Sequence, residues 1–174
     1  GFLKDEHSVF GLDQSLNNLI TLKVNKTLRR NHVMLQQIYE NIPIKNAFVI
    51  VHSNPQGQVT MVQSDYIEDL KIENDRIITR ENALDLATID LKANLEPECI
   101  ISDRTSNEFI VPSENGYRFI WEIIISTQNP YGMWVYHIDA ESSEIIYKED
   151  ELLSLKNGKG AVCKCNNDWH NGKV

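Results

Sequence analysis

The stretch YRFIWEIIIST, residues 117–127, is the longest alternating run in the chain and decides the fold of its second half. Side chains of a β-strand point alternately to its two faces. One face here carries Tyr117, Phe119, Trp121, Ile123 and Ile125, and the other carries Arg118, Ile120, Glu122, Ile124 and Ser126. Turn residues at 113–116, where Asn-Gly suits a hairpin, and at 129–132 bound this strand. Shorter strands are predicted at 133–139 and 144–147, which together indicate an antiparallel sheet.

A helix is predicted before this sheet. Thr79 suits an N-cap, Glu81 lies in the first turn, and apolar residues recur with a helical period until Asn94 or Leu95, ahead of Pro97. Between the helix and the long strand, only the short runs 99–101 and 108–111 have strand character. We therefore predict an α+β protein in which residues 76–150 form a helix-plus-antiparallel-sheet domain.

The first half, residues 1–75, is predicted to be a mainly antiparallel β domain. Residues 31–39 alternate clearly and residues 19–25 weakly, and Asn41-Ile42-Pro43 breaks the pattern at a residue type that tolerates a left-handed turn. The apolar run 47–52, the turn 54–57 and the run 58–63 predict a hairpin. The charged stretch 68–76 is interpreted as a linker, and residues 151–174 as a linker or tail.

Composition and motifs argue for a binding or folding module. The 174 residues include 17 basic and 25 acidic side chains, so the net charge of −8 disfavours a nucleic-acid binder or docking to an anionic membrane. No apolar run approaches the roughly 18 to 20 residues of a membrane span. Phosphate-loop, dinucleotide, nucleophile-elbow and His-Glu-x-x-His motifs are absent from the sequence. The run Glu149-Asp150-Glu151 is better interpreted as solvated charge than as a catalytic pair.

The cysteines are too few for a disulfide scaffold. Cys99 stands alone, whereas Cys163 and Cys165 are two residues apart and His170 follows five residues later. Asn25-Lys26-Thr27 makes Asn25 a candidate for N-glycosylation. The aromatic residues Tyr117, Trp121, Trp134 and Tyr136 can line a carbohydrate or peptide groove, but on paired strands such residues are more often core.

Two stretches resemble a known family. NHVMLQQ (31–37), NIPI (41–44) and Asn46-Ala47 resemble the fungalysin/thermolysin propeptide domain, with Asn41 at the usual glycine of its bend. YRFIWEI (117–123), WVYHIDA (134–140) and EIIYK (144–148) resemble the PepSY domain that follows it in those proenzymes. Ile120 departs from the usual small residue before the tryptophan, and Ser142-Ser143 replaces a Thr-Gly turn. Together the two resemblances cover about residues 9–148.

The resemblance implies a pro-region of a secreted zinc metallopeptidase, fungalysin-like or thermolysin-like. Such a region is not an enzyme and needs no cofactor of its own, because the zinc belongs to the catalytic domain that would follow residues 151–174. Its partner would be that cognate catalytic domain, and it would act outside the cell, or in the periplasm before maturation. It would assist folding, inhibit the peptidase and be cut off. The alternative from another class is a free-standing extracellular binding protein that inhibits or regulates peptidases in trans.

Partner contacts are expected around the turn 129–132 and the chain after the last strand, with Asn129, Tyr131, Glu149, Asp150, Glu151 and Lys156 as candidates. The cleavage site is expected between about Glu149 and Gly160. Cys163, Cys165 and His170 are candidates for reaching the peptidase zinc and displacing its water, because thiolate and imidazole are zinc ligands. The chain has no other clustered metal ligands.

Overall fold

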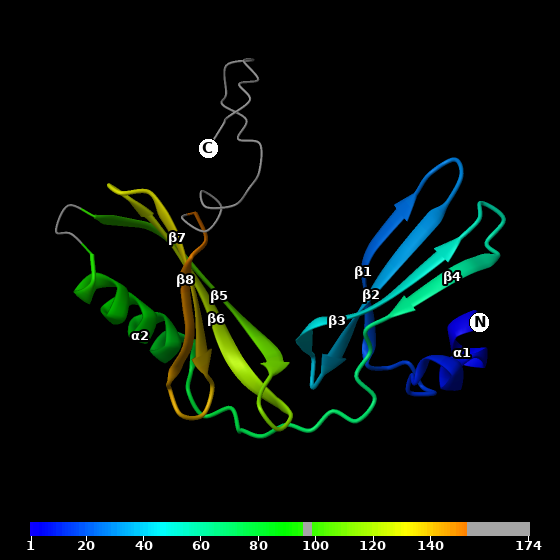
Figure 1. Cartoon of the computed structure of the whole chain (residues 1–174), viewed down its shortest axis with the longest axis horizontal. Helices are drawn as coiled ribbons and strands as arrows, with labels where there is room; N and C mark the ends of the chain where they lie inside the picture. The colour runs from blue at the N-terminus through cyan, green and yellow to red at the C-terminus, as the bar shows by residue number, and fades with distance from the viewer. Residues whose placement is uncertain (96–98, 153–174) are drawn as a thin grey trace, which may run out of the picture.

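The computed structural model of the protein describes residues 1–95 and 99–152. It contains two antiparallel sheets, which we call sheet A and sheet B, joined at one corner (Figure 1). Sheet A consists of β1 (Leu19–Lys26), β2 (Asn31–Tyr39), β3 (Ile42–Ser53) and β4 (Val59–Ser64). Sheet B consists of β5 (Ile100–Pro112), β6 (Tyr117–Gln128), β7 (Gly132–Asp139) and β8 (Ile145–Asp150). A short α1 (Phe2–Asp5) and a 3-10 turn, His7–Phe10, precede sheet A, and α2 (Arg80–Ala93) precedes sheet B.

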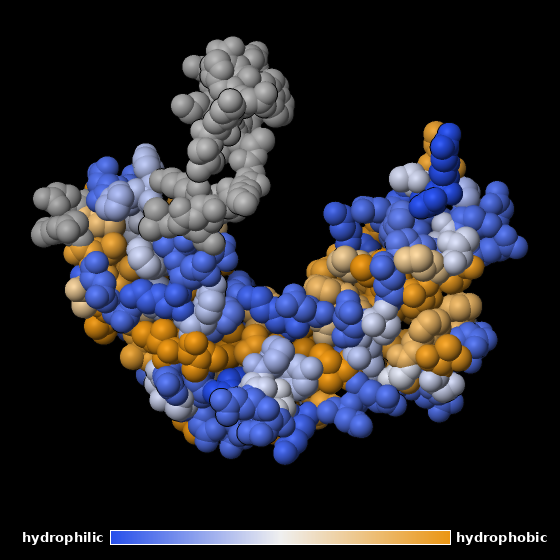
Figure 2. Space-filling model, viewed as in Figure 1, coloured by the Kyte–Doolittle hydropathy of each residue, from blue (hydrophilic) through white to orange (hydrophobic). Residues whose placement is uncertain are grey.

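The strand β3 belongs to both sheets. Its second part pairs with β2 and β4, whereas Ile44 near its start forms a parallel bridge with Ile110 of β5. Both isoleucines are fully buried, in a cluster with Ile42, Ala47, Phe119 and Ala140. From this junction the two sheets diverge, and Figure 2 shows a hollow between them.

A bend allows β3 to serve both sheets. Asn46 has a φ of 66°, and the register with β2 shifts between Gln36 and Ile38. The buried side-chain amide of Gln36 donates to the carbonyl groups of Ile44 (2.7 Å) and Ala47 (2.9 Å), on either side of the bend. These bonds join both sides of the bend in β3 to a side chain of β2.

The second core lies under α2. Ala83, Ala87 and Leu91, spaced four residues apart on one helix face, pack on Ile123, Ile125, Tyr136 and Ile138 of β6 and β7. Thr79 caps the helix as predicted, since its hydroxyl accepts a bond from the backbone N–H of Asn82 (3.2 Å). Figure 1 shows α2 on the side of sheet B that faces away from sheet A. None of the helices in the described ranges is long and apolar enough to cross a membrane.

The stretch predicted as a linker is bonded along its length. The backbone of Ile67 exchanges two hydrogen bonds with the side-chain amide of Gln37 (2.8 and 2.9 Å). Asn74 makes the same kind of paired contact with the backbone of Phe119 (2.8 and 3.0 Å). Further on, the N–H groups of Ile77 and Ile78 donate to the carbonyl of Ala140, both at 2.9 Å. The connection, residues 67–78, is therefore hydrogen-bonded to both sheets, and we call it the strap.

The structure differs from the sequence expectations in two places. Residues 100–101 of the first run and the whole run 108–111 belong to one continuous strand, β5, whose polar middle is paired with β6. Pro43 does not end a strand but lies in β3, because the turn is confined to Glu40 and Asn41, which both have positive φ. The hairpin turn predicted at 113–116 is confirmed between β5 and β6, and a side chain on Gly116 would lie 2.5 Å from the carbonyl oxygen of Lys71 in the strap.

The coarse fold class is that of a strand-dominated protein with one long helix on sheet B. The positive φ expected at Asn41 is confirmed at 67°. The division into domains at 75/76 stays a prediction.

The turn between β7 and β8 yields a test of local strain. Ser143 has a φ of 68°, which costs a residue with a side chain about 1–2 kcal/mol. We expect Ser143→Gly to raise the free energy of unfolding by up to about 1 kcal/mol, after the greater flexibility of unfolded glycine is subtracted. Ser142→Gly is the control: Ser142 has no positive φ and its hydroxyl accepts a bond from Glu144 N (3.3 Å), so this change should destabilise. Urea unfolding of both variants measures the difference, and destabilisation by Ser143→Gly would contradict the assignment of strain.

Candidate partner-binding surface

Two predicted contact segments lie together at one end of sheet B. The turn 129–132 joins β6 to β7, and Asp150 at the end of β8 pairs with Trp134 near the start of β7. One carboxylate oxygen of Asp150 accepts bonds from the backbone N–H groups of Met133 (3.2 Å) and Leu152 (3.0 Å). The side chain of Asp150 thereby fixes the chain as it leaves the sheet. The structure thus brings Asn129 and Tyr131 close to Asp150 and Glu151, which sequence reasoning placed in separate segments.

The turn presents Tyr131 to solvent. Its side chain is 73% exposed, whereas Gly132 beside it is buried. A side chain on Gly132 would lie 2.8 Å from Trp134 Nε1 and 2.9 Å from Thr127 Oγ1, so the backbone beneath Tyr131 is closely packed. An exposed aromatic side chain on such a fixed turn suits a protein contact, because little conformational entropy is lost on binding.

A charged cluster lies on the face of sheet B opposite α2. Glu122 of β6 accepts bonds from Lys45 of β3 and from His137 of β7, the latter at 3.1 Å. The exposed fractions of these side chains are 11% for Glu122, 17% for His137 and 34% for Lys45. Because Lys45 belongs to β3, the strand that joins the two sheets, the cluster links β3 to the middle of sheet B.

The environment of Glu122 favours its ionised form. The hydrogen bond from His137 lowers the pKa of the Glu122 carboxyl, and Lys45 lowers it further, against the opposing effect of burial. The ring of Tyr147 on β8 lies 4.9 Å from that of His137, centroid to centroid, and the Lys45 ammonium lies 5.4 Å from the ring centroid of Phe109. This face therefore combines a compact ionic cluster with aromatic side chains, as protein interfaces commonly do.

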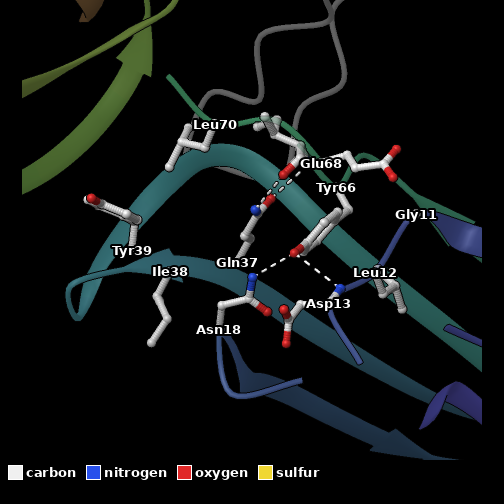
Figure 3. A pocket seen from close by; sticks show the side chains of 11 residues that line it. Gly11, Leu12, Asp13, Asn18, Gln37, Ile38, Tyr39, Tyr66, Glu68 and Leu70 are labelled. Atoms are coloured by element: carbon white, nitrogen blue, oxygen red, sulfur yellow. Dashed lines mark hydrogen bonds between the residues drawn. The ribbon is translucent and has the colours of Figure 1, made fainter. Parts of the chain in front are cut away.

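A pocket of about 380 Å³ lies where the N-terminal segment crosses β2 and the strap (Figure 3). The hydroxyl of Tyr66 accepts bonds from the side-chain amide of Asn18 (2.6 Å) and the backbone N–H of Asp13 (3.4 Å), and Gln37 bonds Ile67 at its wall. Its polar side chains are used largely to hold these segments together. None of the residues predicted to contact a partner lines it.

The structure also gives the positions of the other candidates from the sequence that lie in the described residues. Asn25 is exposed on β1, opposite His32 of β2, so its side chain is accessible. Tyr136 is buried under α2, and Tyr117, Trp121 and Trp134 pack partly buried against the two cores, which favours the structural interpretation of these aromatics. Lys156, Cys163, Cys165 and His170 lie outside the described residues. Within residues 1–95 and 99–152, no three His, Cys, Asp or Glu side chains are grouped so that they could hold a metal ion.

Sequence reasoning did not single out the Lys45–Glu122–His137 cluster. The hairpin centred on residues 129–132 places Glu122 opposite His137, so this pair could have been found from the turn alone. Lys45 could not, because its contact depends on the bend in β3.

Comparison with known proteins finds a similarity in the first part of the chain. Residues 22–66 match the Fungalysin/Thermolysin Propeptide Motif. The matched segment contains Gln36 and Gln37, whose side chains hold the bend of β3 and the strap. The resemblance deduced from residues 31–47 is therefore confirmed.

Relatives extend the similarity to most of the chain. Bacillolysin of Brevibacillus brevis is 26% identical over 166 residues, which cover 91% of this chain and 32% of that protein. Thermolysin of Bacillus caldolyticus is 22% identical over 170 residues, covering 91% and 30%. The chain thus spans about a third of the length of these relatives. The solved Bacillus megaterium YpeB C-terminal domain is similar with a TM-score of 0.40 and 13% identity, covering 86% of this chain and 60% of that one.

Two glutamates on adjacent strands should respond oppositely to neutralisation. Because the folded-state pKa of Glu122 is lowered, its carboxylate stabilises the fold above the unfolded value of about 4.3, and this contribution is lost as pH falls through the folded-state pKa. We expect Glu122→Gln to lower the free energy of unfolding by about 2 kcal/mol at pH 7, with the difference from wild type shrinking below about pH 4.

Glu108 on β5 is the matched control. Burial raises the pKa of its carboxyl, against the opposing effect of Arg76 3.8 Å away. The ionised form is therefore the less favourable one in the fold, and Glu108→Gln should leave stability at pH 7 unchanged or higher. Urea unfolding of both variants between pH 3 and pH 7 (a range set by the glutamate pKa of about 4.3) measures the effect. Equal losses for both variants would contradict the assignment.

Proposed function

We propose that this chain is the non-catalytic pro-region of a secreted zinc metallopeptidase, which assists folding of the catalytic domain, inhibits it and is removed by cleavage. The observation that carries the proposal is the match of residues 22–66 to a propeptide motif. The similarity to bacillolysin and thermolysin over 91% of this chain supports it, because the matched part is only about a third of those proteins. The PepSY resemblance of residues 117–148 belongs to the same proposal.

Assistance in folding requires preferential binding to the folded peptidase. A ligand that binds only the native state stabilises it by RT ln(1 + [L]/Kd). A covalently attached pro-region has an effective concentration of about millimolar, so moderate affinity keeps it bound while the two parts remain joined. Cleavage removes this high local concentration, and the bound fraction then falls. Release after cleavage then follows from dilution alone.

We assign the contact to sheet B. The end formed by the turn 129–132 and by Asp150 offers Tyr131 on a closely packed backbone, and the face opposite α2 borders the hollow seen in Figure 2. The chain leaves β8 at this same end, beside Tyr131. A peptidase bound there would lie next to the segment in which cleavage is expected, between about Glu149 and Gly160. The same bound position would then serve both inhibition and cleavage.

The residues Cys163, Cys165 and His170 remain candidates for blocking the peptidase zinc. The proposal for them rests on their spacing and on the affinity of thiolate and imidazole for zinc. Unchanged inhibition by the Cys163→Ser, Cys165→Ser double variant would exclude the thiols from that role.

The first test is to read the gene beyond the codon for Val174. Continuation into a domain with a His-Glu-x-x-His helix supports a pro-region. A stop codon directly after Val174 would overturn it, and a free-standing binding protein acting in trans would become the better account.

Inhibition in trans tests the contact surface. The full chain 1–174 is added to the separately prepared catalytic domain, and the inhibition constant is measured. We expect Tyr131→Ala to raise this constant at least tenfold, since truncation of a central interface aromatic costs about 1–2 kcal/mol or more. Ile89→Ala is the matched control, because Ile89 is 68% exposed on α2, on the opposite side of sheet B, and should change little. Equal effects of the two variants would contradict the assigned surface.

A further inference from the structure

Among the residues that the structure describes, positive charge is concentrated in one part of this acidic protein. Residues 14–64 contain five basic side chains and one acidic side chain, although the whole chain has a net charge of −8. Four of the five, Lys23, Lys26, Arg29 and Arg30, lie in or next to the β1–β2 hairpin tip. An anion attracted to this tip would be repelled by most of the remaining described surface. The positive charge therefore favours binding of an anion at the tip and not over the protein as a whole.

A pocket of about 320 Å³ lies between two hairpin tips of sheet A. Figure 1 shows the β1–β2 and β3–β4 tips next to each other, at the end of sheet A away from the junction. Arg29 and Arg30 line the pocket from the first tip, and His52, Ser53 and Thr60 line it from the second. The pocket therefore depends on the pairing of β2 with β3, which brings the two tips together.

The two arginines are carried on a fixed turn. The hydroxyl of Thr27 accepts bonds from the backbone N–H groups of Arg29 (3.4 Å) and Arg30 (3.0 Å) and donates to the carbonyl of Arg30 (2.8 Å). The backbone N–H of Thr27 also donates to that carbonyl (2.9 Å). In the described part of the chain neither guanidinium pairs with a carboxylate, so all of their donors are available.

The opposite wall adds hydroxyl and imidazole groups. Ser53 Oγ accepts a bond from the side chain of Asn31 (3.5 Å), which leaves its own hydrogen free to donate. His52 Nε2 lies 3.2 Å from the side-chain oxygen of Gln63, which holds the imidazole at the side of the pocket. The residues that line the pocket thus carry two guanidinium groups, two hydroxyl groups and one imidazole, and Asn54 and Met61 complete the lining.

We propose that this pocket binds a phosphate group. Two adjacent guanidinium groups match the charge of a phosphate, and their planar forks match its several acceptor oxygens. A carboxylate has one negative charge and two oxygens, so it would use fewer of these donors. This site is on sheet A, apart from the sheet B surface assigned to the peptidase, and does not rest on that function.

The phosphate can belong to a soluble compound or to a lipid headgroup. Leu28 lies at the same tip, beside Arg29, and is 98% exposed. An apolar side chain next to cations can enter the interface of an anionic membrane, whereas it contributes nothing to binding of a soluble phosphate. Leu28→Ser therefore separates the two sources without altering the pocket.

The test is a titration of the isotope-labelled full chain with inorganic phosphate at constant ionic strength, followed by NMR. Amide shifts should be confined to residues near 27–30, 52–54 and 60. Arg29→Gln with Arg30→Gln should weaken binding at least about tenfold, because two charge-assisted contacts are lost. Lys23→Gln with Lys26→Gln removes the same charge from the same hairpin outside the pocket and should weaken binding less than about threefold. All four side chains are exposed, so the fold should be retained in both variants.

Sedimentation with phosphatidylglycerol vesicles, with phosphatidylcholine vesicles as the control, gives the second readout. Arginine-dependent binding of free phosphate that Leu28→Ser leaves intact supports a soluble phosphate. Arginine-dependent vesicle binding that Leu28→Ser abolishes supports a lipid headgroup. Equal weakening by the arginine and lysine double variants, shifts spread over the surface, or tighter binding of a glutamate-rich peptide than of phosphate would each overturn the proposal.

Discussion

The architecture depends on the hydrogen bonds that the side-chain amide of Gln36 makes across the bend of β3. Because the amide reaches the carbonyls of Ile44 and Ala47, one strand can turn out of sheet A and lay Ile44 against Ile110 of sheet B. Removal of this amide would remove both hydrogen bonds, each of which contributes about 0.5–1.5 kcal/mol to stability. The bend also carries Lys45, and with it one of the two hydrogen-bond donors that favour the ionised form of Glu122.

Two residues in the stretches that carry the family resemblance, Gln37 and Asp139, have a structural role: both bind the strap between the sheets. Gln37 fastens the start of the strap at Ile67. Asp139 fastens its middle: one oxygen accepts bonds from Asn74 (3.2 Å) and Arg118 (3.1 Å), and the other accepts bonds from the backbone of the β7–β8 turn. Burial opposes ionisation of Asp139, but the bonds from Ser142, Glu141 and Asn74 outweigh it and lower the pKa of its carboxyl. These residues therefore hold the two sheets in one arrangement.

Much of this fold could be predicted from local pattern, and the exceptions have physical causes. Alternation predicted β2 and β6, and the N-cap of Thr79 and the positive φ of Asn41 follow from their residue types. The continuity of β5 was missed because its middle, 103–107, is polar, as an edge strand can be when only one side is paired along most of its length. The requirement for Gly116 comes from the carbonyl of Lys71, more than forty positions away in the sequence, so no local rule could give it.

The candidate surfaces were harder to predict than the fold, because each joins segments that the sequence separates. The turn 129–132 and the end of β8 meet only through the pairing of β7 with β8, and the arginine pocket exists only because β2 pairs with β3. The two surfaces also lie on different sheets and differ in character. The one on sheet B offers an exposed tyrosine and a neutralised ionic cluster, whereas the one on sheet A offers unpaired cations. Since the strap and the junction strand fix one sheet against the other, a partner bound on sheet B leaves the arginine tip free to bind an anion.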